Sequence, residues 1–167
     1  MATITTLSNP LYATATSLAP RVMDNSNFAY RIWREIDLAA AVTAKGSALA
    51  AADVIEALRL PAGVQIINAG AQKTSAMTGT STDLTFDIGT AVDPDQYVDG
   101  WDFDAAAVGS YGTPLGVQLA QNLAVSDTID ITIATMTGTL TGGKVMVWAV
   151  IVDLTNEQRG VIAQPKS

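Results

Sequence analysis

The chain has 167 residues, of which 49% are hydrophobic and only 15% are charged, and its formal net charge is −7. It contains no Cys and no His, which removes disulfides, the commonest general base and most transition-metal ligands. No basic residue lies between Lys73 and Lys144, whereas nine aspartates do, so this stretch cannot neutralise phosphate and nucleic-acid binding is not expected.

The length suits one domain that buries its own core. Residues 1–20 lack the basic and apolar regions of a signal peptide, and no apolar run is long enough to cross a bilayer. We therefore expect no contact with membrane, and folding without disulfides in a reducing cytoplasm. Because so few residues are charged, much of the exterior is Thr, Ser, Ala and Gly, which is typical of a surface that a partner covers.

Residues 1–27 are rich in Thr and Ser, contain Pro10 and Pro20, and lack the periodicity of a core element. We predict an extended N-terminal arm, the alternative being disorder. Four apolar residues interrupt this polar arm and are predicted to contact a neighbouring subunit: Leu7, Leu11, Tyr12 and Leu18. The remaining boundaries are a domain over residues 28–154 and a loose polar tail over residues 155–167.

The first predicted strand covers residues 28–38, where Tyr30, Ile32 and Ile36 alternate with polar residues and Trp33. Residues 39–44 are expected to continue it as far as a turn at Lys45-Gly46. Residues 48–60 are ambiguous, because their alanines favour a helix. Val54, Ile55 and the turn residues Pro61-Ala62-Gly63 also suit a strand, and we predict one over 54–60 because the neighbouring pattern is all β and the resemblance given below agrees.

Further strands are predicted in the acidic half of the chain, joined by Gly, Asp and Thr turns. Their ranges are 64–76 with a bulge at Ala69-Gly70, then 84–88, 97–103, 117–123, 129–133 and 144–154. The last is apolar on both faces and is predicted to be a central strand buried on both sides. Short strands at this spacing predict an all-β fold, an antiparallel β-sandwich or jelly roll.

The acidic segment from Asp93 to Asp104 is the sharpest local feature. Clustered carboxylates suit calcium, and Asp93, Asp95 and Asp99 are the candidate ligands. The spacing does not fit the helix-flanked calcium loop, which ends in a glutamate at its twelfth position. The alternative is turn chemistry, in which Asp side chains accept hydrogen bonds from nearby backbone amides.

No catalytic constellation emerges, and we predict that the chain is not an enzyme and holds no cofactor unless calcium. A glycosidase needs one of two carboxylates buried, and a loop crowded with aspartates is a poor place for that. Ser47 near Lys45 and Ser75 near Lys73 are the closest approach to a nucleophile and base. A carbohydrate-binding module that uses Tyr97, Trp101 and the acidic loop stays open as an alternative function.

Several turn and strand motifs carry a resemblance to a known family. They are Asp53-Val54-Ile55-Glu56, Leu60-Pro61-Ala62-Gly63-Val64, Ala69-Gly70, Asp95, Val98-Asp99-Gly100, residues 127–130 and residues 145–153. Over residues 48–153 the chain resembles small virion proteins of tailed bacteriophages, including those of cyanobacteria. The resemblance implies a capsid decoration or cement protein with a jelly-roll-like sandwich, made in the host cytoplasm and placed on the outer capsid surface. It also implies a homo-oligomer, a trimer, bound to the major capsid protein; a knob or tail-associated adhesion role stays open.

Overall fold

The computed structural model describes residues 2–5, 29–112 and 120–154, and these form two β-sheets and one short helix. In chain order the elements are β1 (Thr3–Thr5), β2 (Tyr30–Asp37), α1 (Leu38–Lys45), β3 (Val54–Leu60), β4 (Val64–Gly79), β5 (Asp83–Gly89), β6 (Val98–Asp102), β7 (Gln121–Asn122), β8 (Asp127–Thr137) and β9 (Leu140–Asp153). The arm residues Leu7, Leu11, Tyr12 and Leu18 and the tail from residue 155 lie outside the described residues.

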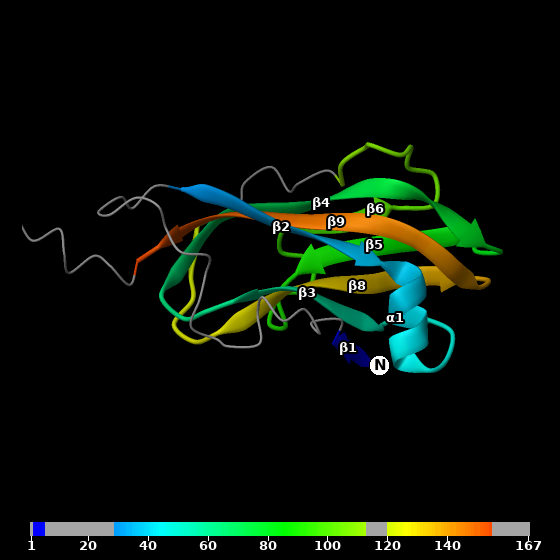
Figure 1. The fold of residues 1–167 in the computed structure, drawn as a ribbon, viewed down its shortest axis with the longest axis horizontal. Coiled ribbons are helices and arrows are strands. Elements are labelled where there is room, and N and C mark those ends of the chain that lie inside the picture. Colours follow the sequence, from blue (N-terminus) through cyan, green and yellow to red (C-terminus); the bar gives the residue numbers. More distant parts are fainter. Residues whose placement is uncertain (1, 6–28, 113–119, 155–167) are drawn as a thin grey trace, which may run out of the picture.

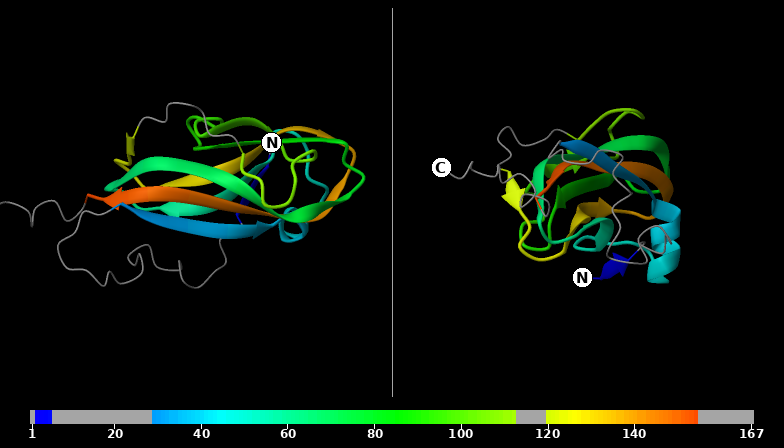
Figure 2. Two further views of the ribbon diagram at one scale, coloured as in Figure 1. Left: turned by 90° about the horizontal axis from the view of Figure 1, so that it is seen from above. Right: turned by 60° about the vertical axis from the view of Figure 1, so that its left-hand side comes forward.

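The two sheets pack face to face as a sandwich (Figures 1 and 2). One sheet has the strand order β1-β3-β8-β5-β6 and the other has the order β2-β9-β4-β7. β1 pairs with β3 in parallel, and every other strand pair in the described part of the chain is antiparallel. The predicted all-β sandwich is therefore confirmed.

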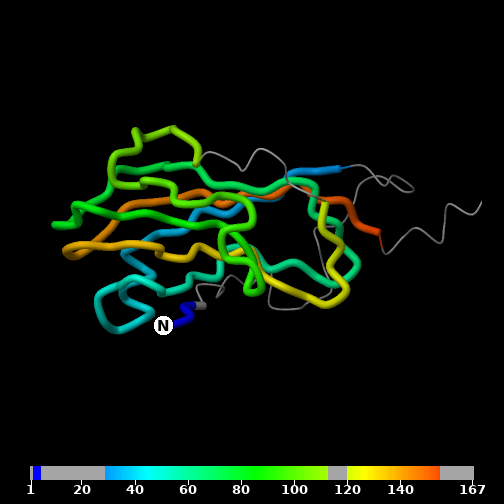
Figure 3. The backbone as a smooth tube through the Cα atoms, turned by 180° about the vertical axis from the view of Figure 1, so that it is seen from behind, coloured from blue at the N-terminus to red at the C-terminus, as the bar shows by residue number. Residues whose placement is uncertain are grey.

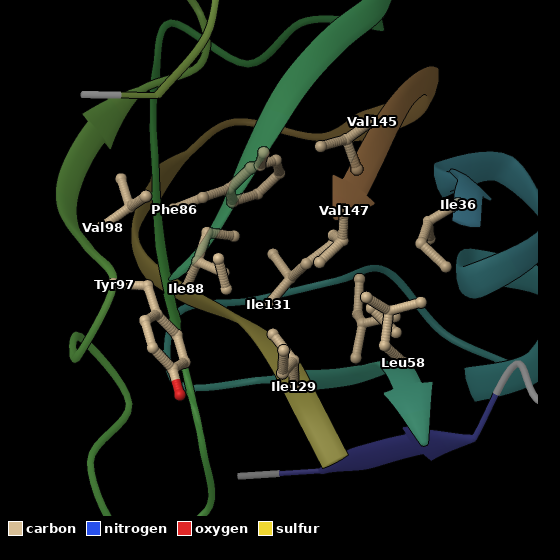
Figure 4. Close-up of a cluster of buried hydrophobic side chains, with 14 of the residues drawn as sticks. Ile36, Leu58, Phe86, Ile88, Tyr97, Val98, Ile129, Ile131, Val145 and Val147 are labelled. Carbon is tan, nitrogen blue, oxygen red and sulfur yellow. The ribbon is translucent and has the colours of Figure 1, made fainter. Parts of the chain in front are cut away.

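Alternating side chains of the two sheets meet between them and form one core (Figure 4). From the five-stranded sheet come Leu58, Phe86, Ile88, Ile129 and Ile131, all almost fully buried. From the four-stranded sheet come Ile36, Val145 and Val147. This burial of aliphatic and aromatic surface is the main force that holds the sheets together.

Residues 39–44 form part of a helix, so the prediction that they extend the first strand is wrong. The Asp37 carboxylate accepts hydrogen bonds from the backbone N–H groups of Ala39 and Ala40 and caps the first turn of α1. Leu38 and Ala41 are buried against the sandwich. The helix ends at Gly46, whose φ of 73° suits a residue without Cβ. The capping residue, Asp37, also continues the alternating pattern of β2, so the pattern gives no sign that a helix begins there.

The predicted strand over residues 54–60 is confirmed as β3. Ala57 is fully buried there, and a bulge separates Glu56 from Leu58 in the pairing with β8. The other alanines of this segment, at positions 48 and 50–52, are exposed and precede β3, so most of the residues that favour a helix lie outside the strand.

β4 and β9 differ from prediction in two details. The ladder between them is regular at Ala69 and Gly70, and its irregularities lie between Ile66 and Asn68 and beyond Lys73. β9 is central, between β2 and β4, as predicted. Only one of its faces is fully buried, however, because the other points away from the core and is half-exposed.

Candidate functional site

The outward side of the four-stranded sheet carries aromatic and aliphatic side chains that the described residues leave partly exposed. We call its side chains Arg31, Trp33, Met146, Trp148 and Val150 the aromatic face. Trp33 lies opposite Trp148 and Arg31 opposite Val150 across the β2–β9 ladder, so these side chains share one side of the sheet. Trp33 is 59% exposed, which is high for the largest apolar side chain. Such a patch is typical of a protein-docking surface.

Trp148 lies at the centre of the aromatic face and is held in a fixed position. A Cβ atom on Gly70, its neighbour on β4, would lie only 3.0 Å from the indole ring, so the ring rests against bare backbone. On the other side the Arg31 guanidinium lies 5.1 Å from the ring centroid, a cation–π contact. The indole N–H is buried and finds no acceptor among the described residues. An unpaired buried donor is costly, which fits a surface completed by a partner.

The charges around this face nearly cancel. Lys144 Nζ donates a hydrogen bond of 3.0 Å to Glu35 Oε1, and this hydrogen bond is the main cause of the lowered pKa of Glu35. Both side chains are well exposed, so the pair contributes little to stability. Arg31 and Asp37 are the other charged groups on this side of β2, and Asn68 and Gln72 of β4 add polar side chains beside the aromatic and aliphatic ones.

The outward side of the five-stranded sheet has the opposite character. We call Glu56, Asp83, Asp87, Asp102 and Asp130 the acidic face. Glu56 lies opposite Asp130 in the β3–β8 ladder. Burial raises the pKa of Asp130 to about 6, and the charges of Glu56 and Asp127 add to the shift. Burial also raises the pKa of Asp87, with further contributions from Asp99 and Asp95.

The candidate calcium ligands are only partly brought together. A shared hydrogen bond with Asp95 raises the pKa of Asp93, so these two carboxyl groups are neighbours. The side chains of Asp93, Asp95 and Asp99 do not form a three-ligand group, and the described residues contain no other. The backbone of Asp93 takes part in a turn, in which its carbonyl accepts from the N–H of Thr90 at 2.9 Å. Two neighbouring carboxylates alone make a weak calcium site, so the candidate ligands need a direct binding measurement.

The aromatic residues proposed for sugar binding are part of the core. Tyr97 and Trp101 are only 1% and 8% exposed. The Tyr97 hydroxyl donates to Gln121 Oε1 at 3.1 Å, and burial raises its pKa. Trp101 packs edge-on against Phe103, with ring centroids 5.3 Å apart. Neither ring offers a free face to a sugar, and the exposed tryptophan is Trp33 instead.

Lys73 is a buried lysine that sequence reasoning did not single out, except as a neighbour of Ser75. Its side chain donates a hydrogen bond of 2.7 Å from Nζ to the carbonyl oxygen of Phe103, and Nζ lies 4.6 Å from the centroid of that ring. Burial lowers its pKa. The amine is occupied in holding the segment after β6 against β4, so it is not a base for Ser75.

No helix in the described ranges has the length and apolar character needed to span a membrane. No protein-family model matches the sequence, and no curated protein does. Among the solved structures that match are two whose chains are covered almost completely. A chain in the capsid of Ralstonia phage GP4 has a TM-score of 0.60 and 17% identity, over 91% of this chain and 98% of that one.

A chain in the cyanophage Pam1 capsid asymmetric unit has a TM-score of 0.51 and 12% identity, over 86% of this chain and 99% of that one. At such identities the similarity concerns the fold. The chain therefore has an all-β fold that is also found in the capsids of two phages.

Proposed function

We propose that this chain is a non-enzymatic structural protein of a phage head, a decoration or cement protein that binds the assembled shell from outside. The observation that carries the proposal is the likeness to two capsid chains across nearly the full length of both partners. Such coverage means that the whole domain, and not one motif within it, shares the fold of these capsid chains, which supports the proposal.

The aromatic face supplies the physical means of binding. An exposed tryptophan, Trp33, with the half-buried Met146, Trp148 and Val150 beside it is typical of the centre of a protein interface. The chain's partner is then the major capsid protein, with each subunit burying about 800 Å² against it. Trp33 and Met146 are the expected anchors, since both project from the sheet without partners in the core.

Oligomerisation would strengthen the attachment. Three linked subunits on a threefold position of the shell gain about 10²–10⁴ in avidity over one subunit, provided that all three engage together. We therefore propose a trimer that ties adjacent shell subunits together and resists pressure from the packaged genome.

The test is co-sedimentation with phage heads that lack this chain. We expect wild-type protein to sediment with the heads, and Trp33→Ser to lose at least tenfold in affinity, since interface tryptophans often contribute about 2 kcal/mol or more. Val92→Ser is the matched control, because Val92 is 88% exposed but lies in the loop between β5 and β6. The proposal would be refuted if the wild-type protein did not bind the heads, or if Trp33→Ser bound them as well as Val92→Ser.

A further inference from the structure

The N-terminal strand is bound to the domain as an extended peptide would be. β1 adds to the edge of the five-stranded sheet through three register pairs with β3, from Thr3↔Val54 to Thr5↔Glu56. The N–H of Val54 donates to the Ala2 carbonyl at 2.8 Å. Ile4 is only 4% exposed and forms part of the core. When a peptide adds as a strand to a sheet edge, backbone hydrogen bonds provide affinity and buried side chains provide specificity, as they do here.

The site that receives β1 is built largely by other residues. The Asp53 carboxylate accepts from the backbone N–H of Ala2 at 3.1 Å and of Ala50 at 2.8 Å, and it forms an ion pair with Lys45. Lys45 Nζ also donates to the Ala48 carbonyl at 2.7 Å. Burial alone would raise the pKa of Asp53, but these hydrogen bonds outweigh it and the pKa is lowered. Without β1 the carboxylate keeps two of its three donors, so the site is pre-organised.

The segment that joins β1 to β2 is long enough for β1 to bind either to its own domain or to that of a neighbouring copy. Twenty-three residues, 6–28, separate Thr5 from Ala29 in the sequence. A chain of that length spans up to about 80 Å when extended, whereas a compact domain of this size has a radius of gyration of about 15 Å. Connections in compact domains are usually about 2–6 residues long. The site of an adjacent copy is therefore within reach.

We propose that the edge of β3 beside α1 is a strand-acceptor site, and that it takes residues 2–5 of a neighbouring copy of this chain when copies are crowded together. Exchange replaces each contact of β1 by an identical one, so it costs little. A tethered strand competes at an effective concentration on the order of millimolar. Exchange is thus rare in dilute protein and prominent where copies lie side by side. Figure 3 shows β1 beside the corner of α1 and β3.

The absence of cysteine in the chain allows a clean test. A Thr3→Cys chain is mixed with a tagged Val54→Cys chain at about 10 µM and at about 1 mM, oxidised, and analysed by intact mass. Exchange alone brings these two positions together between chains, because Val54 is only 8% exposed. We expect the mixed disulfide to rise from background to a major product. Thr3→Cys mixed with Val125→Cys is the control for collision, since Val125 is 72% exposed and lies near the Leu60 end of β3, at the opposite end of that strand from Val54.

A second measurement uses the Thr3→Cys/Val54→Cys double variant, in which oxidation in dilute solution locks β1 to its own chain. Exchange predicts that wild-type chains associate at about 1 mM by sedimentation, and that the locked variant associates at least tenfold less until it is reduced. Mixed disulfide no greater than in the Val125 control, or wild-type chains that stay monomeric at 1 mM, would overturn the proposal. Neither assay involves a phage head, so failure here and failure of head binding are separate results.

Discussion

At the scale of single residues, Asp130 shows how burial can turn a solvent-side carboxylate into a source of pH dependence. Its position on the outward parity of β8 is what alternation predicts, yet the side chain is 4% exposed and its Oδ1 has no partner among the described residues. Parity identifies the face of a sheet on which a side chain lies, but not how closely its neighbours cover it. The raised pKa of this group therefore had no signal in the sequence.

Asp130→Asn tests the consequence. With a folded-state pKa of about 6 against an ordinary value of 3.8, the native protein holds this proton more tightly than the unfolded chain. Ionisation of Asp130 thus lowers stability as pH rises from about 4 through 6. We expect Asp130→Asn to raise the free energy of unfolding by about 1–2 kcal/mol at pH 8, and to leave it nearly unchanged near pH 4. Urea unfolding at both pH values measures this, and an equal effect at both would contradict it.

Lys73 is the second residue whose role depends on the fold. Lys73→Ala removes the donor to the Phe103 carbonyl and leaves a cavity beside that ring, so we expect a loss of about 2–4 kcal/mol in the free energy of unfolding. Hydrogen exchange should also quicken at Gly109 and Gly112, whose N–H groups donate to the carbonyls of Lys73 and Ala71.

The exposed Lys144→Ala provides the matched control for Lys73→Ala, and it should cost less than about 0.5 kcal/mol. A Lys73→Ala protein as stable as this control would show that Lys73 does not hold the segment.

At the scale of elements, periodicity was sufficient wherever one face of a strand is buried. It located β2, β5 and β8, and it placed Trp33 on the outward side of β2, whereas β3 was predicted from the strands around it and β9 from its long apolar run. It did not locate α1, since the deciding signal was a single capping side chain, Asp37. Nor did it reveal the aromatic face. The sequence alone does not distinguish an apolar row on the outer side of β9 from core, because that requires knowing that no other described element packs on this side of the sheet.

The loop between β5 and β6 contains two of the candidate calcium ligands, Asp93 and Asp95. We expect no calcium-dependent rise in melting temperature, because only Asp93 and Asp95 are neighbours and the Asp93 backbone is engaged in a turn. Calorimetric unfolding with and without about 5 mM CaCl₂ measures this. That concentration largely saturates even the weak calcium sites of extracellular proteins. A rise that Asp95→Asn abolishes would contradict the expectation and establish a site.

At the scale of the whole molecule, the sandwich presents two unlike surfaces on opposite sides. The acidic face, with the net charge of −7, favours solubility and repels other anionic surfaces. The aromatic face is apolar and nearly neutral, so it is the side on which association gains most from the removal of water. This polarity predicts that the chain binds a shell with the four-stranded sheet inward and the five-stranded sheet toward solvent.

A cryo-electron microscopy map of phage heads carrying this chain is the most direct test of that orientation. We expect density for the sandwich on the outer surface of the head, with Trp33 and Trp148 buried against a shell subunit and Asp83 and Asp87 facing solvent. A map in which the four-stranded sheet faces solvent, or in which the chain does not touch the shell, would contradict it.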